Sequence, residues 1–396
     1  MATCTCLCSL AIASVCSPAA PSGASQGART MRHPSGLIGY TEYRTNLPGG
    51  RLANVSTMRA CVVRADGTRR RVLAEELIRR PHAWTQFAGW SPDGNRAIVL
   101  SCWESAENAA WEEGHQGFRF VPDGWLVDCC LVDLNGRASV NLTAVDRVSF
   151  YNTGLFFWPG QPNRLGFQAL IEGESRPFSM NADGTSKQDL AHQSGFAYGF
   201  NASPDGQRIA YHQDYQVVLA DGDGGNARRV ETGAPFNFSP KWSPDGQWVL
   251  FLSGEHYRCH PWIVRRDGSG LRRLAGRGEY EGVVEFLDVP DFHGGSSDVP
   301  VWSPDSQWVY YTARIGQAVE LMRISLTGEP EQLTHSPAGV LHYHPVLSPD
   351  GGWVAFGSTR TGRRQLHVAP ADGTGARLVT HVVEGYGAMW AYWQPR

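Results

Sequence analysis

Short apolar runs recur along the chain, and each of them follows the same kind of polar turn. The run at 248–251, Trp-Val-Leu-Phe, comes directly after Trp-Ser-Pro-Asp-Gly-Gln at 242–247. Related turns that lead into similar runs lie at 90–94, 202–206, 302–306 and 347–351. Proline fixes φ, aspartate bonds its own backbone and glycine accepts a positive φ, so each copy predicts a tight turn between two strands. The β-branched and aromatic residues that follow indicate buried strands.

A second type of turn comes about 20 residues after the first, as expected for a structural repeat. It is an Asp-Gly turn and is found at 182–185, 266–270 and 371–375. A short final strand follows it, for instance at 272–274 and 377–380. A unit of four strands with two marked turns, repeated along the chain, predicts the blades of a β-propeller.

The two ends of the chain are expected to share one blade. Residues 388–393 have the pattern of an innermost strand, residues 37–43 that of a second strand, and residues 60–68 that of a third strand with its turn. Joining them closes the ring and removes the exposed sheet edges. We therefore predict an all-β, seven-bladed β-propeller over residues 36–396. Six blades are the alternative if the degenerate copy at 158–163 does not begin a blade.

The two turn motifs resemble the repeats of TolB-type β-propellers, and the resemblance covers residues 36–396. It implies a propeller with a ligand-binding mouth. Because propellers host many unrelated activities, the function has to be argued from a site.

Residues 1–35 differ from the rest of the chain. An apolar run at 7–15 precedes small residues and proline, as in a secretory signal, but the first charge is Arg29. The alternative is that Met31 is the true start. We expect this segment to be disordered or removed. The protein would be periplasmic or secreted if the segment is a signal peptide, and cytoplasmic otherwise.

Charge and cysteine usage restrict the classes of partner and site. The net charge is -3 with 18% charged residues, which does not favour nucleic acid or an anionic membrane as a partner. No stretch is long and apolar enough to span a bilayer. Four of the nine cysteines lie in the leader and the remaining five are an odd number, so we expect no disulfide framework. We expect a monomer.

The propeller topology assigns most histidines to one face. Both types of glycine turn lie at one end of the ring, so the other connections lie at the opposite mouth. Most of the 13 histidines fall in those connections or beside them, as does a long insertion at 103–123. A second insertion, at 277–298, we expect to be ordered. Part of the histidine bias follows from the polarity of connections, but it still favours this mouth as the ligand site.

His342 and His344 are the sharpest local feature at that mouth. Residues two apart on an extended strand point to the same side, so both imidazoles are expected to face the channel. With His293 they would suit a divalent transition metal, Mn²⁺ or Zn²⁺, and Asp291 and Asp298 could orient the rings. The alternative is that these histidines only hydrogen-bond to their neighbours.

A second cluster, at 253–260, contains an acid, a base and a cation, and His212 lies one blade earlier. His212 and His260 are candidate bases. Arg314 and Arg360 follow second strands at equivalent positions and could bind a carboxylate through two parallel hydrogen bonds. The alternative interpretation is a solvated loop with an ion pair.

The arrangement also resembles oligogalacturonate lyase, a seven-bladed propeller with a manganese site. That resemblance implies metal-assisted β-elimination with His293, His342 and His344 as ligands. His212 or His260 would be the base, and Arg314 or Arg360 would hold the substrate carboxylate. The family has a further histidine ligand in its last blade, where this chain has Gly-Tyr-Gly at 385–387.

Two functional hypotheses follow. The first, which we prefer, is a binding propeller that holds a peptide, protein or glycan at one mouth. The second is a metal-dependent oligosaccharide lyase. A hydrolase nucleophile elbow and a phosphate-binding loop are both missing from the sequence, because its glycine-rich pieces lie at hairpin turns.

Overall fold

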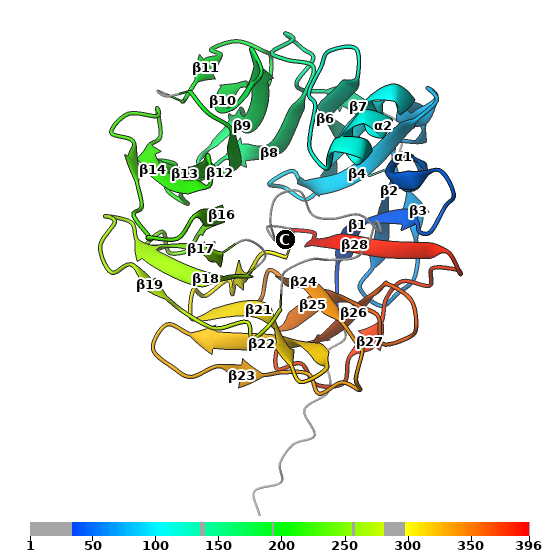
Figure 1. The fold of residues 1–396 in the computed structure, drawn as a ribbon, viewed down its shortest axis with the longest axis vertical. Coiled ribbons are helices and arrows are strands. Elements are labelled where there is room, and N and C mark those ends of the chain that lie inside the picture. Colours follow the sequence, from blue (N-terminus) through cyan, green and yellow to red (C-terminus); the bar gives the residue numbers. More distant parts are fainter. Residues whose placement is uncertain (1–33, 135–138, 192–193, 256–257, 281–297, 396) are drawn as a thin grey trace, which may run out of the picture. The chain divides into compact units, whose positions relative to one another are not determined.

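The computed structural model describes residues 34–395 except 135–138, 192–193, 256–257 and 281–297. Its strands form seven four-stranded antiparallel sheets arranged as a ring, with one edge of each sheet toward the centre (Figure 1). The fold is therefore the predicted seven-bladed β-propeller. The predicted leader lies almost wholly outside the described residues.

The four strands of each blade are named in order from the innermost to the outermost. Blade 1 is β28 (Tyr386–Trp393), β1 (Leu37–Arg44), β2 (Arg59–Arg64) and β3 (Arg71–Val72). Blade 2 is β4 (Ala83–Trp90), β5 (Arg96–Glu104), β6 (Trp125–Asp133) and β7 (Ser139–Asn141). Blade 3 is β8 (Asn152–Trp158), β9 (Gln161–Ile171), β10 (Glu174–Asn181) and β11 (Gln188–Asp189). Blade 4 is β12 (Ala197–Ala202), β13 (Arg208–Gln213), β14 (Gln216–Asp221) and β15 (Arg228–Arg229).

The remaining blades follow the same plan. Blade 5 is β16 (Phe236–Trp242), β17 (Trp248–Glu255), β18 (Arg258–Arg265) and β19 (Arg272–Arg273). Blade 6 is β20 (Val301–Trp302), β21 (Trp308–Ile315), β22 (Ala318–Ser325) and β23 (Glu331–Gln332). Blade 7 is β24 (His342–Leu347), β25 (Trp353–Ser358), β26 (Gln365–Pro370) and β27 (Arg377–Leu378). The helices are α1 (Gly50–Val55), η1 (Glu75–Ile78) and α2 (Ala106–His115).

The degenerate turn at 158–163 does begin the second strand of a complete blade, blade 3, so the six-bladed alternative is wrong. The closing blade also forms as predicted, because β28 pairs with β1 from Ile38 opposite Trp393 to Arg44 opposite Tyr386. Figure 1 shows the last strand of the chain beside its first.

The Ser-Pro-Asp-Gly turns share one local network of hydrogen bonds. In blade 5 the hydroxyl of Ser243 donates to Asp245 Oδ1 at 2.5 Å and accepts from the Trp248 amide at 2.9 Å. The Gly246 amide donates to the Ser243 carbonyl at 2.8 Å, with Gly246 at φ 69°. The turns that begin at Ser91, Ser203, Ser303 and Ser348 repeat this network. Glycine occupies a position of the turn that needs a positive φ. The serine hydroxyl accepts from the amide five residues later, so the second strand begins at a fixed number of residues after the serine.

Tryptophans at the ends of three innermost strands, β4, β20 and β28, join neighbouring blades. Trp90 Nε1 donates to the Tyr392 carbonyl, Trp302 Nε1 to the Lys241 carbonyl and Trp393 Nε1 to the Val346 carbonyl, at 3.0–3.3 Å. Each acceptor lies on the innermost strand of the preceding blade. The rings themselves are buried among apolar residues of adjacent blades, so the hydrophobic cores lie between the sheets.

Both kinds of glycine turn lie on one face of the ring, which we call the turn face. An ion pair of 2.6 Å joins Arg266, at the Asp-Gly turn of blade 5, to Asp205, in the Ser-Pro-Asp-Gly turn of blade 4. The helices α1 and α2 occupy connections between second and third strands, and they pack against each other. We call the opposite end of the ring, which carries them, the helix mouth.

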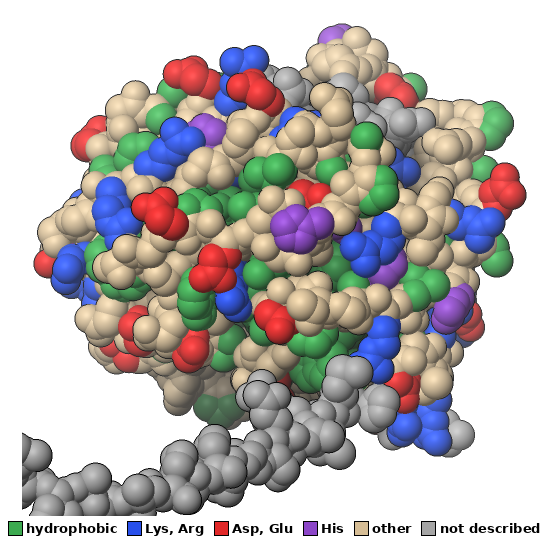
Figure 2. Space-filling model, turned by 90° about the horizontal axis from the view of Figure 1, so that it is seen from below, with side chains coloured by type: hydrophobic (Ala, Val, Ile, Leu, Met, Phe, Trp, Pro, Cys, Tyr) green, Lys and Arg blue, Asp and Glu red, His purple; other side chains and the backbone are tan. Residues whose placement is uncertain are grey.

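The outer surface is mixed in charge. Figure 2 shows basic and acidic side chains interspersed on the side of the molecule that it views. The five described cysteines are all buried and none is in a disulfide. No helix of the described residues has the length and apolarity that a membrane span requires.

Candidate functional site

His342 begins β24 and is fully buried between blades 6 and 7. Its Nε2 lies 2.9 Å from Ser336 Oγ and 3.5 Å from Glu320 Oε2, and Ser336 Oγ is 3.1 Å from the same carboxylate. Burial lowers the pKa of His342 to about 3, and nearby Arg360 adds to this effect. The ring is therefore neutral at physiological pH. Ser336 and Glu320 both approach Nε2 of His342. In a catalytic Ser-His-acid triad the serine and the acid bond to different nitrogens of the ring, so these residues do not form such a triad.

His344 does not sit beside His342 in the way that simple strand alternation predicts. A β-bulge interrupts β24 between Tyr343 and Val346, and His344 has φ 49°. The His344 amide donates to Asp298 Oδ1 at 3.0 Å, and its half-buried ring lies 6.2 Å from the ring of Trp390. The bulge breaks the two-residue period, so the expectation that both imidazoles face the channel together is not met.

The proposed metal ligands do not assemble from the described residues. No group of three or more His, Cys, Asp or Glu side chains in the described part of the chain is arranged to hold a metal ion. His293 and Asp291 lie outside the described residues. Asp298 meets the backbone of His344, and its other partners among the described residues are Arg277, Tyr280 and Thr312.

A buried charge network surrounds Asp298, and no motif of the sequence signals it. Arg277 and Asp298 are each 1% exposed at the side chain, with Nη2 3.3 Å from Oδ2. The same Oδ2 accepts from Tyr280 OH at 2.8 Å and from Thr312 Oγ1 at 2.5 Å. Arg277 also donates to the carbonyl and the hydroxyl of Thr312, both at 2.8 Å. The network fixes the entry into blade 6 and, through Asp298, the bulge of β24.

The two candidate bases act as acceptors of backbone amides. His212, on β13, is 4% exposed, and its Nδ1 accepts from the Ser239 amide of the next blade at 3.2 Å. His260, on β18, accepts at Nδ1 from the Arg277 amide at 3.3 Å. Burial lowers the pKa of His260 to about 4, with Arg273 and Arg277 contributing. Each ring thereby fixes local backbone geometry, on separate blades.

Arg314 and Arg360 lie at the helix-mouth ends of the second strands of blades 6 and 7, but not at equivalent positions, because Arg314 is still within β21 and Arg360 comes after β25. Arg314 is partly exposed near the end of β21, and Arg360 is exposed just after β25. In the described part of the chain neither guanidinium forms an ion pair or hydrogen bond. Arg258, exposed at the start of β18, is in the same situation. Three arginines without an ion pair among the described residues therefore border the mouth over blades 5–7.

The part of the mouth over blades 2–4 and the start of blade 5 is aromatic. The rings of Phe118 and Phe120 are stacked with their centroids 5.5 Å apart, and the rings of Phe120 and Phe196 are stacked with their centroids 5.7 Å apart. Tyr151 meets Phe120 edge-on at 4.8 Å. Tyr215, 37% exposed at a turn with φ 61°, meets Phe236 at 5.1 Å. We call this set the aromatic rim: Phe118, Phe120, Tyr151, Phe196, Tyr215 and Phe236. Phe118 and Phe120 lie in the insertion at 103–123, but the sequence analysis did not single them out, and no spacing along the chain indicates that Phe120 meets Phe196 of blade 4.

The helix α2 holds the aromatic rim in place from beneath. Ser105 caps its N-terminus by accepting from the Asn108 amide. The buried Asn108 donates to Glu104 at 3.0 Å and to Glu112 at 3.2 Å, and accepts from Arg119 Nε at 3.1 Å. Glu112 also accepts from the Arg119 amide at 2.9 Å. Arg119 lies between Phe118 and Phe120, so this polar cluster orients both rings.

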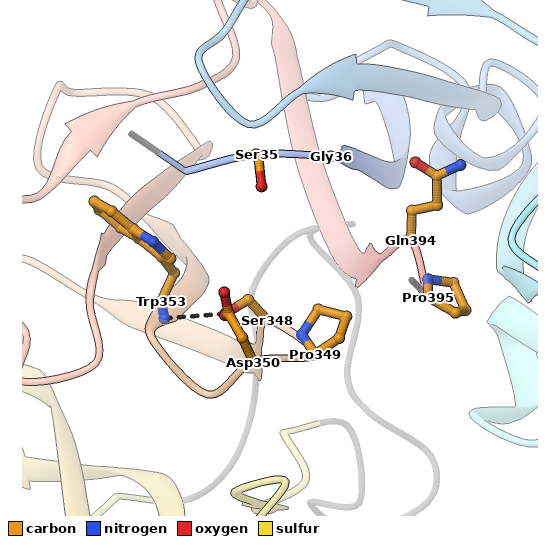
Figure 3. A pocket seen from close by; sticks show the side chains of 8 residues that line it. All are labelled: Ser35, Gly36, Ser348, Pro349, Asp350, Trp353, Gln394 and Pro395. Atoms are coloured by element: carbon orange, nitrogen blue, oxygen red, sulfur yellow. Dashed lines mark hydrogen bonds between the residues drawn. The ribbon is translucent and has the colours of Figure 1, made fainter. Parts of the chain in front are cut away.

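A small cavity of about 120 Å³ lies on the turn face, away from all these residues. Figure 3 shows Ser35 and Gly36 facing the turn of blade 7, with Gln394 at one side. Ser348 in its wall is bonded within its own turn and accepts from the Trp353 amide at 3.0 Å. None of the histidines or arginines singled out from the sequence lines this cavity.

Known proteins resemble this chain over parts of its sequence. Residues 213–396 match the family described as TolB beta propeller domain. An uncharacterized protein of Agrobacterium fabrum is 34% identical over 82 residues, which are 20% of this chain and 28% of that protein. An uncharacterized peptidase of Bacillus subtilis is 25% identical over 207 residues, which are 40% of this chain and 29% of that protein. This chain thus spans less than a third of the length of these curated relatives.

Solved structures resemble nearly the whole chain. TolB from Acinetobacter baumannii has a TM-score of 0.51 at 14% identity, over 92% of this chain and 68% of that one. An oligogalacturonate lyase in complex with manganese has a TM-score of 0.53 at 13% identity, over 89% of each chain. At such identities the likeness establishes the fold. Residues 213–396 thus match the TolB beta propeller domain family, and the described chain as a whole is a seven-bladed propeller whose fold resembles that of TolB.

Proposed function

We propose that this chain is a binding propeller whose helix mouth holds an acidic glycan. The observation that carries the proposal is the division of the mouth into an aromatic half and a cationic half. The aromatic rim covers blades 2–4 and reaches Phe236 at the start of blade 5, and Arg258, Arg314 and Arg360 border blades 5–7 without ion-pair partners among the described residues.

The two halves suit the two chemical features of an acidic sugar chain. Aromatic rings offer large, rigid apolar faces, and the C–H face of a pyranose ring packs on such a surface. A guanidinium binds a carboxylate through two parallel hydrogen bonds, which fixes its direction as well as its position. The three arginines form no ion pair with another described residue, so no such pair has to be broken before they bind.

A metal-dependent lyase is the second hypothesis, because the similar lyase structure is in complex with manganese. The described residues do not fit a metal ion. His342 is enclosed by Ser336 and Glu320, and the His344 ring lies beyond a bulge. We therefore derive no metal-assisted step for this chain.

Isothermal titration calorimetry with galacturonate oligomers tests the proposal, with methyl-esterified oligomers of the same length as the neutral control. The double variant Arg314→Ala/Arg360→Ala should weaken binding of the acidic oligomer roughly ten- to a hundredfold, as loss of charge-assisted hydrogen bonds predicts. The matched control is Arg229→Ala, which removes an exposed arginine from the outermost strand of blade 4 and should change nothing.

Two other outcomes would decide against the proposal. Equal binding by the double variant, or no binding of either oligomer, would refute the acidic-glycan site. Ultraviolet absorbance of the same mixtures reports unsaturated uronate, and its appearance would establish the lyase hypothesis instead.

A further inference from the structure

The seven innermost strands carry a single Lys, Arg, Asp or Glu side chain, that of Lys241 on β16. It is also one of only two exposed residues on these strands, the other being Gly154. An innermost strand has its own sheet behind it and a blade on either side. Lys241 is the penultimate residue of β16, directly before the turn, so its exposed side chain meets solvent at the turn-face end of the central channel.

The backbone at Lys241 is held from both neighbouring blades. Asn201 of blade 4 donates through Nδ2 to the Pro240 carbonyl at 2.6 Å, and Trp302 of blade 6 donates to the Lys241 carbonyl at 3.3 Å. The stem of the side chain thus starts from a fixed point on the channel wall. In the other blades the equivalent positions are neutral and half-buried: Gly89, Phe157, Asn201, Val301, Val346 and Tyr392. A single cation therefore stands in an otherwise neutral ring.

The Lys241 amine has no counter-charge among the described residues. In the described part of the chain no carboxylate lies within ion-pair distance of it, whereas the other lysine, Lys187, pairs with Asp146 at the surface. Enclosure by the blades lowers the pKa of the Lys241 amine from its usual value. Low-dielectric walls concentrate the field of such a cation along the channel, so an anion that enters is attracted more strongly than at an open surface.

We propose that the central channel holds a small monocarboxylate at Lys241. One ammonium matches one negative charge, and the neutral ring on the other blades suits an apolar body behind the carboxylate better than a doubly charged phosphate. The proposal does not depend on the glycan site, because it rests on residues of the channel wall and not on the aromatic rim or the mouth arginines.

The presence of only two lysines in the chain makes the test direct. Reductive methylation with ¹³C-formaldehyde keeps the charge of each amine and gives one lysine resonance for Lys241 and one for Lys187, assigned with Lys241→Arg. Titration with acetate or galacturonate at constant ionic strength should shift the Lys241 resonance saturably. It should also raise the pKa of Lys241, because the anion binds the protonated form. The Lys187 resonance is the internal control and should not respond.

Three results would overturn the proposal. The first is failure of Lys241 to react under conditions that methylate Lys187, since the channel would then be closed to small molecules. The second is a shift that is linear and equal at both lysines. The third is an equal, saturable response to inorganic phosphate, which would remove the assignment of a monocarboxylate.

Calorimetry of two variants gives an independent measurement. Lys241→Met has a side chain of similar length without the charge and should weaken acetate binding in the channel roughly ten- to a hundredfold. Lys241→Arg should retain binding and extend it to higher pH, because the guanidinium stays protonated. Unchanged binding by Lys241→Met would contradict the proposal. If that variant does not fold, the titration of the ¹³C-methyl resonance of Lys241 in the wild-type protein tests the proposal instead.

Discussion

Removing Asp298 should destabilise the protein far more than removing an exposed carboxylate. In the folded protein Asp298 is the counter-charge of Arg277, and both side chains are 1% exposed. Its oxygens also accept from Thr312, Tyr280 and the His344 amide. The variant Asp298→Ala leaves a fully buried guanidinium unpaired and two buried hydroxyl groups and one amide without their acceptor.

The size of the effect follows from these contacts. Breaking one side of a buried ion pair costs about 3–5 kcal/mol, because the remaining charge stays desolvated. The double variant Arg277→Met/Asp298→Ala removes the guanidinium as well, so no unpaired buried charge remains. The double variant should therefore lose clearly less than the sum of the two single variants.

Urea unfolding followed by tryptophan fluorescence measures these free energies of unfolding. Asp146→Ala is the matched control, since it removes the exposed partner of Lys187 and should cost less than about 1 kcal/mol. A loss of less than about 1 kcal/mol in Asp298→Ala, or strict additivity in the double variant, would refute the reasoning.

Three further predictions concern pH, packing and the aromatic rim. Because the folded protein holds the pKa of His342 near 3, against an ordinary value of 6.5, the unfolded chain binds the extra proton and stability falls as pH falls from about 6.5 to about 3. The share of His342 is about 2 kcal/mol at pH 5, and the melting temperature of His342→Gln should decline less steeply over this range than that of the wild type. Gly357→Ala should lower the melting temperature strongly, since its new methyl group would lie 2.0 Å from the Tyr343 ring, while Gly362→Ala meets no neighbour and should show only the milder cost of its positive φ. Asn108→Ala should lower the free energy of unfolding by about 1–3 kcal/mol, because Glu104 and Arg119 lose their hydrogen bonds to Asn108. It should also weaken glycan binding, because Phe118 and Phe120 would be held less firmly. Unchanged stability and binding would contradict the role of this cluster.

The fold was predictable because the signals that specify it are local. Each Ser-Pro-Asp-Gly turn is held by bonds among a few consecutive residues, such as those from Ser243 to Trp248, so its sequence alone marks the turn. Even the degenerate copy at Trp158 kept enough of the pattern to begin a blade. The meeting of the two chain ends followed because an innermost strand and a second strand were each recognisable alone.

The site was less predictable because its geometry depends on contacts between blades. The bulge at His344 is coupled to Asp298 of the preceding blade, and the role of His212 is set by an amide of the following blade. No spacing along the chain reports either contact. Arg314 and Arg360 were placed correctly at the ends of their strands, since that position follows from the repeat; that they bind a ligand remains a prediction, as does any role for His293.

The seam between β28 and β1 has a consequence for biosynthesis. The Leu37 amide bonds to the side chain of Gln394, a residue 357 positions later, so the second of these partners is synthesised long after the first. Until β28 has left the ribosome, β1 has an uncovered edge that another strand could pair with. Blades 2–7 can assemble before that point, but blade 1 is complete only when β28 pairs with β1.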